Sequence, residues 1–204
     1  MNQPLIIGIT GGIGSGKSTL ARKLRSQGYL VYDCDREAKK LQDENPFVRQ
    51  KIQDLFGKGI YDEERLRRKE LAKIVFKNPD LLKKLNEIVH PFVKEDFKSW
   101  INQHFSEKFL FIESAILFES SFNELVDKII LMTASEDVRI KRVVKRDGIS
   151  MEEVKDRIMR QLPDSEKIPY ADYIIHSDDG KPLLEKMQII LNDLQKQIKA
   201  VEKR

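Results

Sequence analysis

A glycine-rich segment that ends in Lys17-Ser18 is the part of this sequence with the clearest chemistry. It reads TGGIGSGKST over residues 10–19 and follows the apolar run from Leu5 to Ile9. This is the complete P-loop pattern, Gly-x-x-x-x-Gly-Lys-Ser, in which backbone N–H groups surround the phosphates of a nucleotide. We therefore expect this loop to bind ATP through Gly12, Ile13, Gly14, Ser15, Gly16, Lys17, Ser18 and Thr19.

Two side chains of the loop and one later acid are suited to the phosphates and a metal ion. Lys17 is expected to bridge the β- and γ-phosphates, and the Ser18 hydroxyl is expected to ligate Mg²⁺. Residues 109–113 read FLFIE, an apolar run closed by an acid, which is the layout of a Walker B element. Glu113 is therefore the second candidate metal residue, acting through a water molecule.

The segment Asp33-Cys34-Asp35 offers a candidate general base. It ends a short apolar run, and open α/β sheets bind their ligands at the carboxyl ends of strands. A carboxylate at that place can orient an acceptor hydroxyl and take its proton. Asp33 is the first candidate and Asp35 the alternative. Either could instead cap the helix that follows, a reading that weighs more on Asp35.

A basic segment follows the fourth expected strand. Arg139, Arg142 and Arg146 are spaced three and four residues apart, so they share one face of a helix. Such a face can close as a lid over a nucleotide and stabilise charge on the phosphoryl group during transfer. It can equally be a solvated surface paired with the acids between 152 and 156.

These residues need a sheet to position them. The strand, loop, helix and strand of residues 5–32 form one βαβ unit, which predicts a parallel sheet. Further apolar runs extend the prediction to a five-stranded parallel sheet flanked by helices, with strands at 5–9, 29–32, 109–112, 128–132 and 172–175. We expect one P-loop kinase domain with a core at 1–35, 108–135 and 165–204, a helical substrate-binding insert at 36–107 and a lid at 136–164.

The insert is expected to be helical, because apolar residues recur in it at helical spacing. Breaks are expected at Asn45-Pro46, at Gly57 to Gly59, at Asn78-Pro79 and at His90-Pro91. A closing amphipathic helix is expected from Pro182 to about Val201.

The composition limits the cellular compartment and the kinds of partner that we expect. The chain has 204 residues, a net charge of +4 and a single cysteine, Cys34. One cysteine excludes an internal disulfide framework and fits a reducing compartment. No apolar run approaches the roughly 20 residues of a membrane-spanning helix, and the N-terminus lacks the pattern of a secretory signal. We expect a cytoplasmic protein that binds neither membrane nor nucleic acid; the oligomeric state is not predicted.

The motifs also limit the classes of P-loop protein to which the chain can belong. A GTPase would need a base-reading Asn-Lys-x-Asp, and the sequence contains none. Residues 54–57 fit the loose Asp-x-x-Gly pattern, but they belong to an amphipathic helix with no strand before it. A small P-loop protein with a helical insert and a basic helical segment is typical of a small-molecule kinase.

The motifs taken together resemble those of the dephospho-CoA kinase family, and they span nearly the whole chain. In chain order they are TGGIGSGKST at 10–19, Asp33-x-Asp35, His90-Pro91, Leu117-Phe118-Glu119, Arg146-Asp147-Gly148, Arg157-Ile158 with Gln161, and Ala171-Asp172-Tyr173.

The resemblance implies ATP-dependent phosphorylation of the ribose 3′-hydroxyl of dephospho-CoA, the last step of coenzyme A synthesis, with ATP and dephospho-CoA as partners. It implies that Asp33 is the base, that Arg142 acts in catalysis with Lys17, and that Arg146 contacts ATP from the lid. The insert would receive the coenzyme A precursor, with His90 and Leu117 near it.

The chain departs from the family pattern at two strand ends. Glu113-Ser114-Ala115-Ile116-Leu117 stands where the family usually has Asp-x-Pro-Leu-Leu, and His176-Ser177 stands where an Asn is usual. The first departure changes the segment that begins with Glu113, the residue expected to hold the metal ion. The second changes a position that the family pattern associates with nucleotide contact. A kinase of another nucleoside, nucleotide or small alcohol stays an alternative, as does a regulatory or nucleic-acid-associated ATPase.

Overall fold

The computed structural model describes residues 3–202 of the chain. The chain divides into two compact units. We call Met1–Val31 with Glu107–Arg204 the P-loop unit and Tyr32–Ser106 the helical unit. The helical unit contains most of the segment expected as the insert, 36–107, together with Tyr32 to Asp35.

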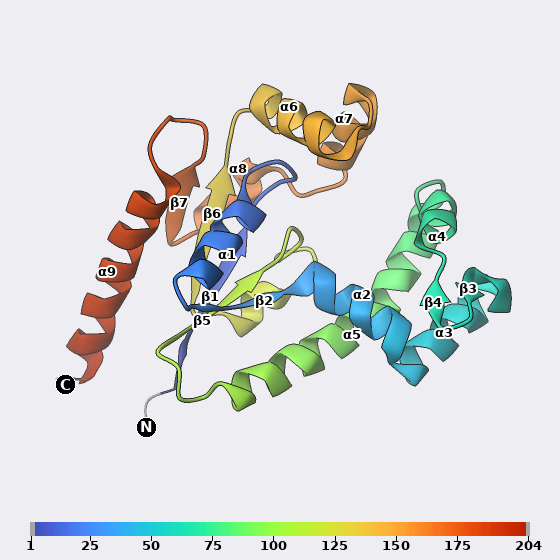
Figure 1. Ribbon diagram of the computed structural model, residues 1–204, viewed down its shortest axis with the longest axis horizontal. Coiled ribbons are helices and arrows are strands. Elements are labelled where there is room, and N and C mark those ends of the chain that lie inside the picture. The colour runs from blue at the N-terminus through green and yellow to red at the C-terminus, as the bar shows by residue number, and fades with distance from the viewer. Residues whose placement is uncertain (1–2, 203–204) are drawn as a thin grey trace. The chain divides into compact units, whose positions relative to one another are not determined.

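A parallel sheet carries the P-loop. Its strands are β1 (Leu5–Thr10), β2 (Leu30–Asp33), β5 (Phe109–Glu113), β6 (Lys128–Thr133) and β7 (Tyr173–His176). They lie in the order β2-β5-β1-β6-β7, and β1 pairs in parallel with β5 and β6, as β6 does with β7 (Figure 1). The predicted five-stranded parallel sheet is confirmed. Because Ile9 pairs with Glu113, the end of β5 meets the beginning of the P-loop.

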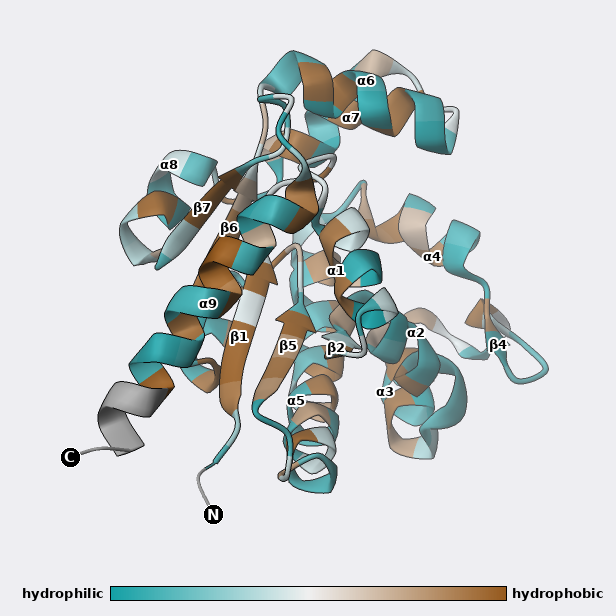
Figure 2. Cartoon of the chain, turned by 60° about the vertical axis from the view of Figure 1, so that its left-hand side comes forward, coloured by the Kyte–Doolittle hydropathy of each residue, from teal (hydrophilic) through white to brown (hydrophobic). Residues whose placement is uncertain are grey.

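The core of the P-loop unit lies between the sheet and two helices. Helix α1 (Lys17–Ser26) contributes Leu20 and Leu24, and α9 (Leu183–Glu202) contributes Leu191 and Leu194. The strands supply the apolar residues they pack on, and Figure 2 shows β1 and β5 mostly brown while α9 is brown and teal in turn. Strands buried on both faces read as continuous apolar runs, which is why the sequence revealed them. At the edge of the sheet, Tyr173 donates a 2.6 Å hydrogen bond to Asp193 of α9.

Two helices lie side by side beyond the end of β6 (Figures 1 and 2). Helix α6 (Glu136–Asp147) ends at Gly148 in the left-handed region, and α7 (Met151–Met159) begins with a capping box of Ser150 and Glu153. They share a small apolar cluster. A short helix α8 (Asp164–Lys167) and the 3-10 turn η3 (Ile168–Tyr170) lead into β7, and a further 3-10 turn, η2 (Phe122–Leu125), precedes β6.

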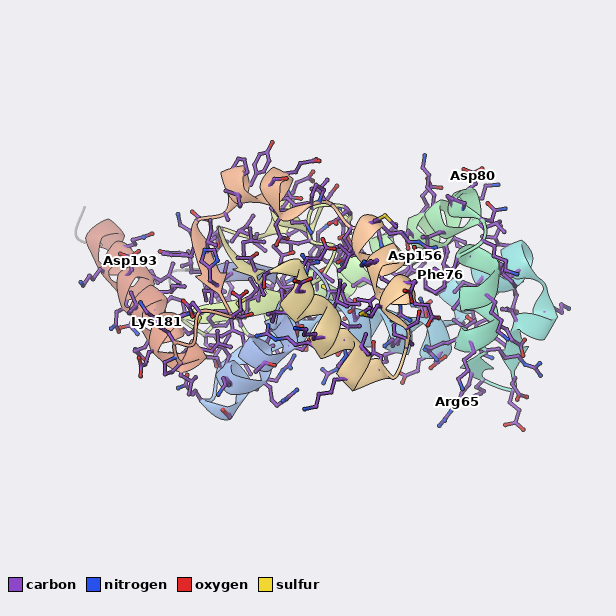
Figure 3. All side chains as sticks on the ribbon, turned by 90° about the horizontal axis from the view of Figure 1, so that it is seen from above. Arg65, Phe76, Asp80, Asp156, Lys181 and Asp193 are labelled. Carbon is purple, nitrogen blue, oxygen red and sulfur yellow. The ribbon has the colours of Figure 1, made fainter. Side chains whose placement is uncertain are left out.

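The helical unit consists of four helices and a small hairpin in the part of the chain that the structure describes. They are α2 (Cys34–Glu44), α3 (Pro46–Phe56), the 3-10 turn η1 (Lys58–Ile60), β3 (Tyr61–Asp62), β4 (Arg65–Leu66), α4 (Arg68–Val75) and α5 (Pro79–Gln103). The antiparallel pair β3–β4 was not predicted. Strands of two residues are too short to show an alternating pattern. Arg65 and Asp80 point outward on opposite sides of this unit (Figure 3).

The breaks predicted at Asn45-Pro46 and at Asn78-Pro79 are confirmed, and in the structure each asparagine caps the helix that follows. Asn45 accepts hydrogen bonds from the N–H groups of Phe47 and Val48, and Asn78 caps α5 in the same way. In both helices proline takes the first position, where no N–H is needed.

The predicted break at His90-Pro91 is wrong, because α5 continues through Pro91 to Gln103. Proline removes one backbone donor and normally ends or kinks a helix. Here Leu85, Val89, Val93 and Phe97 form one buried stripe on both sides of Pro91, and that packing carries the helix past it.

Among the described residues, no helix is both long and apolar enough to cross a membrane.

Candidate active site

The P-loop adopts a conformation that depends on glycine. Gly14 has φ 80°, and a Cβ atom there would lie 2.6 Å from the backbone oxygen of Arg139. Gly16, with φ 101°, leads into α1 as its N-cap. Side chains are strongly disfavoured at such torsions. The pattern therefore fixes the loop shape that the sequence predicted.

The beginning of α1 is suited to an anion. No described side chain caps this helix, and its first turn contains no acidic residue. Helix N-termini carry partial positive charge and N–H groups that favour phosphate. Lys17 adds a full positive charge at the first helical position, and its ammonium group donates to the backbone oxygen of Gly12 at 3.2 Å.

Ser18 and Glu113 meet beside the P-loop. The Ser18 hydroxyl donates a 2.7 Å hydrogen bond to Oε1 of Glu113, and Glu113 is only 7% exposed at the end of β5. Hydroxyl and carboxylate oxygens are the donors that Mg²⁺ accepts, and this ion takes its other ligands from water and phosphate. Within the described part of the chain no cluster of three or more His, Cys, Asp or Glu side chains could hold a metal by itself. The pair fits an ion that arrives with a nucleotide.

The three arginines of α6 do not all lie in the same environment. Arg139 is buried, and its Nε donates to the backbone oxygen of Ile13 at 2.9 Å. Arg142 donates to the backbone oxygen of Gly14 at 3.2 Å, and to the hydroxyl and backbone oxygen of Ser177 at 2.7 and 2.9 Å. Arg139 and Arg142 therefore lie on the P-loop.

Arg146 has a different environment. It pairs with its neighbour Asp147 at 2.6 and 2.9 Å, and more than half of its side chain is exposed. This hydrogen-bonded pairing lowers the pKa of Asp147 and raises the pKa of Arg146. In this conformation Arg146 does not reach the P-loop, and its predicted contact with ATP stays a prediction.

Asp33 is half-buried at the end of β2, in the helical unit. Its Oδ1 accepts a 3.0 Å hydrogen bond from the N–H of Arg36, so Asp33 is the N-cap of α2. We expected this capping role more at Asp35, which is instead exposed in the first turn of α2. An N-cap is not an obstacle to base function, because it fixes the carboxylate at the strand end.

A buried hydrogen bond supports the residue next to Asp33. The Tyr32 hydroxyl donates to Oδ2 of Asp96 at 2.6 Å, and its ring packs on Phe97 and Trp100 with centroids 4.9 and 5.5 Å away. Burial, and secondarily the bond to Asp96, raise the pKa of Tyr32 well above its usual range. The hydroxyl therefore stays a donor throughout the physiological range.

We predict that Tyr32→Phe lowers the free energy of unfolding by about 1–3 kcal/mol, since it leaves Asp96 without this donor while the ring packing remains. Urea denaturation measures the change. The double variant Tyr32→Phe with Asp96→Leu should lose less than the sum of the two single variants, because neither polar group is then left behind. Additive losses would show that the hydrogen bond does not stabilise the unit.

The two expected substrate contacts beyond Asp33 lie in different settings. His90 is half-buried on α5, and its pKa is lowered by burial and by the nearby Lys94. Leu117 is fully buried, and a Cβ atom on Gly8 would lie 3.0 Å from its Cδ2. In this conformation the Leu117 side chain packs in the core and does not line a site. Both substrate contacts stay predictions.

Gln161 and Ser177 approach the P-loop without having been assigned a role from the sequence. Gln161 accepts a 2.8 Å hydrogen bond from the N–H of Ile13. Ser177 holds Arg142, and it lies 3.5 Å from where a Cβ of Gly16 would be. Gln161 was part of a recognised motif, but spacing alone does not show where a side chain beyond a helix end points.

Arg139 also fills the space above Gly12. A Cβ atom on Gly12 would lie 2.0 Å from Nη2 of Arg139. We predict that Gly12→Ala lowers the free energy of unfolding by about 1–3 kcal/mol, the usual cost of overpacking. Urea denaturation of Gly12→Ala, Arg139→Ala and the double variant checks this. In the double variant the methyl group no longer meets Arg139, so the loss in free energy of unfolding should be smaller than the sum of the losses in the two single variants. Additive losses would mean that the methyl group does not clash with Arg139.

Comparison with known proteins adds independent evidence. The family model described as "Dephospho-CoA kinase" matches residues 5–182. A curated relative of that name from Porphyromonas gingivalis is 46% identical over 157 residues, which is 77% of each chain. Another, from Bacteroides fragilis strain YCH46, is 39% identical over 178 residues, or 87% of each.

Solved structures agree with these matches. The protein TT1252 from Thermus thermophilus is 34% identical with a TM-score of 0.77, and the alignment covers 99% of this chain and 98% of that one. A dephospho-CoA kinase from Campylobacter jejuni is 28% identical with a TM-score of 0.62 and 97% coverage of both chains. A shikimate kinase from Bacteroides thetaiotaomicron, at 16% identity and a TM-score of 0.52, shares the fold.

Proposed function

The chain belongs to the dephospho-CoA kinase family, and we propose on this basis that it transfers the γ-phosphate of ATP to the ribose 3′-hydroxyl of dephospho-CoA, giving coenzyme A and ADP. The observation that carries the proposal is the family match over residues 5–182. This range includes the P-loop, Asp33, Glu113 and the arginines of α6. A P-loop by itself is compatible with many classes of nucleotide-binding protein.

On the donor side, Gly12 to Thr19 bind ATP. The positive end of α1 and the backbone N–H groups of the loop receive the phosphates, and Lys17 moves from the Gly12 oxygen to the β- and γ-phosphate oxygens. Ser18 and Glu113 are the residues that would hold Mg²⁺, which when bound neutralises charge on the phosphate oxygens. The 2.7 Å contact between Ser18 and Glu113 supports this assignment.

On the acceptor side, Asp33 orients the ribose 3′-hydroxyl. As the hydroxyl oxygen bonds to the γ-phosphorus, the bond to the β–γ bridging oxygen breaks, ADP departs, and the hydroxyl proton passes to Asp33. Proton transfer late in the step suits a carboxylate, because the hydroxyl becomes acidic only as the new bond forms. The helical unit receives the rest of dephospho-CoA, with His90 as a contact, and Leu117 of the P-loop unit is the other contact that we propose.

The segment 136–164 acts as the lid. Arg142 exchanges its bonds to Gly14 and Ser177 for contacts to the phosphoryl group, where its charge stabilises the transition state. Arg146 leaves Asp147 for ATP. Weak, exposed ion pairs of this kind are readily exchanged, because their net contribution to stability is small.

A substrate panel tests the proposal. Purified protein with Mg-ATP should phosphorylate dephospho-CoA far faster than adenosine, AMP or water. Comparable turnover of AMP would instead identify a kinase of another nucleotide. ATP hydrolysis stimulated by DNA or RNA would identify a nucleic-acid-associated ATPase.

Fractionation of cells checks the cytoplasmic location, which we propose together with the function.

A further inference from the structure

Ile13, at the tip of the P-loop, is held at three points. Its N–H donates to Oε1 of Gln161 at 2.8 Å, and its backbone oxygen accepts from Nε of Arg139 at 2.9 Å. Its side chain packs against the apolar cluster of Ile140, Val143 and Val154. All of these partners belong to residues 136–161, which we call the α6–α7 pair.

The partners of Ile13 are themselves fixed. Nε2 of Gln161 donates to the backbone oxygen of Ala115 at 3.4 Å, and the next residue, Leu162, donates its N–H to Glu119 at 2.9 Å. The position of Gln161 is therefore set from both sides. It is part-buried, so its bond to Ile13 is shielded from water.

Arg139 is braced in the same way. Its Nη1 lies 3.7 Å from Oδ2 of Asp164, and that oxygen accepts a 2.8 Å hydrogen bond from the Thr133 hydroxyl. Thr133 is the last residue of β6, which pairs with β1. The hydrogen bond from Arg139 thus comes from a point that is linked to the sheet, and the one to Gln161 from a point that is linked to the segment after β5.

We infer that Ile13 is the residue through which the α6–α7 pair sets the shape of the P-loop, and that Gln161 is a positioning residue for ATP. Gln161 acts through the loop and does not contact the phosphates. Ile13 stands directly before Gly14 to Ser18, whose N–H groups surround the phosphates, so its peptide orientation sets the direction of theirs. This inference rests on the proposed function only in taking ATP as the ligand of the P-loop.

The test removes the Gln161 bond while it keeps the side-chain length. Gln161→Met should weaken binding of Mg-ADP, measured by calorimetry without acceptor, by about tenfold, the effect of one lost hydrogen bond. The KM for ATP should rise while the KM for dephospho-CoA stays unchanged. Met159→Gln is the matched control, because Met159 ends α7 two residues before Gln161 and is 74% exposed; it should bind Mg-ADP as the wild type does.

A second variant guards against a folding defect. Ile13→Ala removes the packed side chain and leaves both backbone hydrogen bonds. It should lower the melting temperature, because apolar contacts are lost, and it should weaken Mg-ADP binding in the same direction at a temperature where the variant is still fully folded. Wild-type or tighter Mg-ADP binding by Gln161→Met would overturn the inference, because the hydrogen bond between Gln161 and Ile13 would then not favour nucleotide binding. Failure of the substrate panel with normal Mg-ADP binding would overturn the proposed function alone.

Discussion

Asp33→Asn is expected to lower kcat by about 10²–10⁴, the usual loss when a general base is removed. Asparagine has nearly the same shape and is an equally good N-cap, so its side-chain oxygen can still accept from the N–H of Arg36 and keep α2 in place. Binding of Mg-ADP should be unchanged. Steady-state kinetics with saturating ATP and dephospho-CoA measure the loss, and thermal unfolding checks that the fold is intact.

Asp35→Asn is the matched control for this experiment. Asp35 lies two residues away, is exposed, and is the alternative base. Turnover by Asp35→Asn should stay within about twofold of the wild type, as for a surface change away from the chemistry. If Asp35→Asn lost the activity and Asp33→Asn kept it, the roles of the two carboxylates would be reversed. Full activity in both variants would exclude this strand end as the source of the base.

Lys17→Ala is expected to weaken nucleotide binding and to lower kcat by about 10²–10³, the typical loss of one preorganised charge or donor at a developing charge. Lys17 is 7% exposed and starts α1, so the variant removes a positive charge at the end of the helix that receives the phosphates. Calorimetry with Mg-ADP and single-turnover kinetics separate the two effects. A loss confined to kcat would mean that Lys17 acts only on the transition state.

Arg22→Ala is the control for Lys17→Ala. Arg22 lies on the same helix, carries the same charge and is exposed. Removing it tests whether the positive charge of α1 as a whole attracts the nucleotide. Because exposed charges are screened by salt, its effect on Mg-ADP binding should be small and should vanish as ionic strength rises. The loss from Lys17→Ala should persist under the same conditions.

The sequence predicted those parts of the molecule that short patterns determine. Buried parallel strands read as unbroken apolar runs, and the P-loop requires glycine at fixed spacing, so both could be found without the structure. The breaks at Asn45-Pro46 and at Asn78-Pro79 could be found in the same way, because a proline and the residue before it mark a boundary locally.

What the sequence could not show depends on tertiary packing. Proline predicts a break wherever it occurs, and only the buried stripe around Pro91 explains why α5 continues. Arg139 and Arg146 look equivalent by spacing, yet one is buried on Ile13 and the other is exposed beside Asp147. In each case, contacts between residues far apart in the sequence determine where the helix or the side chain lies.

The surroundings of Trp100 have a practical consequence. Trp100 is the single tryptophan of the chain, and its ring lies 4.8 Å from that of His104 and 5.5 Å from that of Tyr32, all within the helical unit. The indole fluorescence of the protein therefore originates entirely from the unit that carries Asp33 and His90. Because we propose that this unit receives dephospho-CoA, we expect its fluorescence to follow a titration with dephospho-CoA in the absence of ATP, without an attached dye.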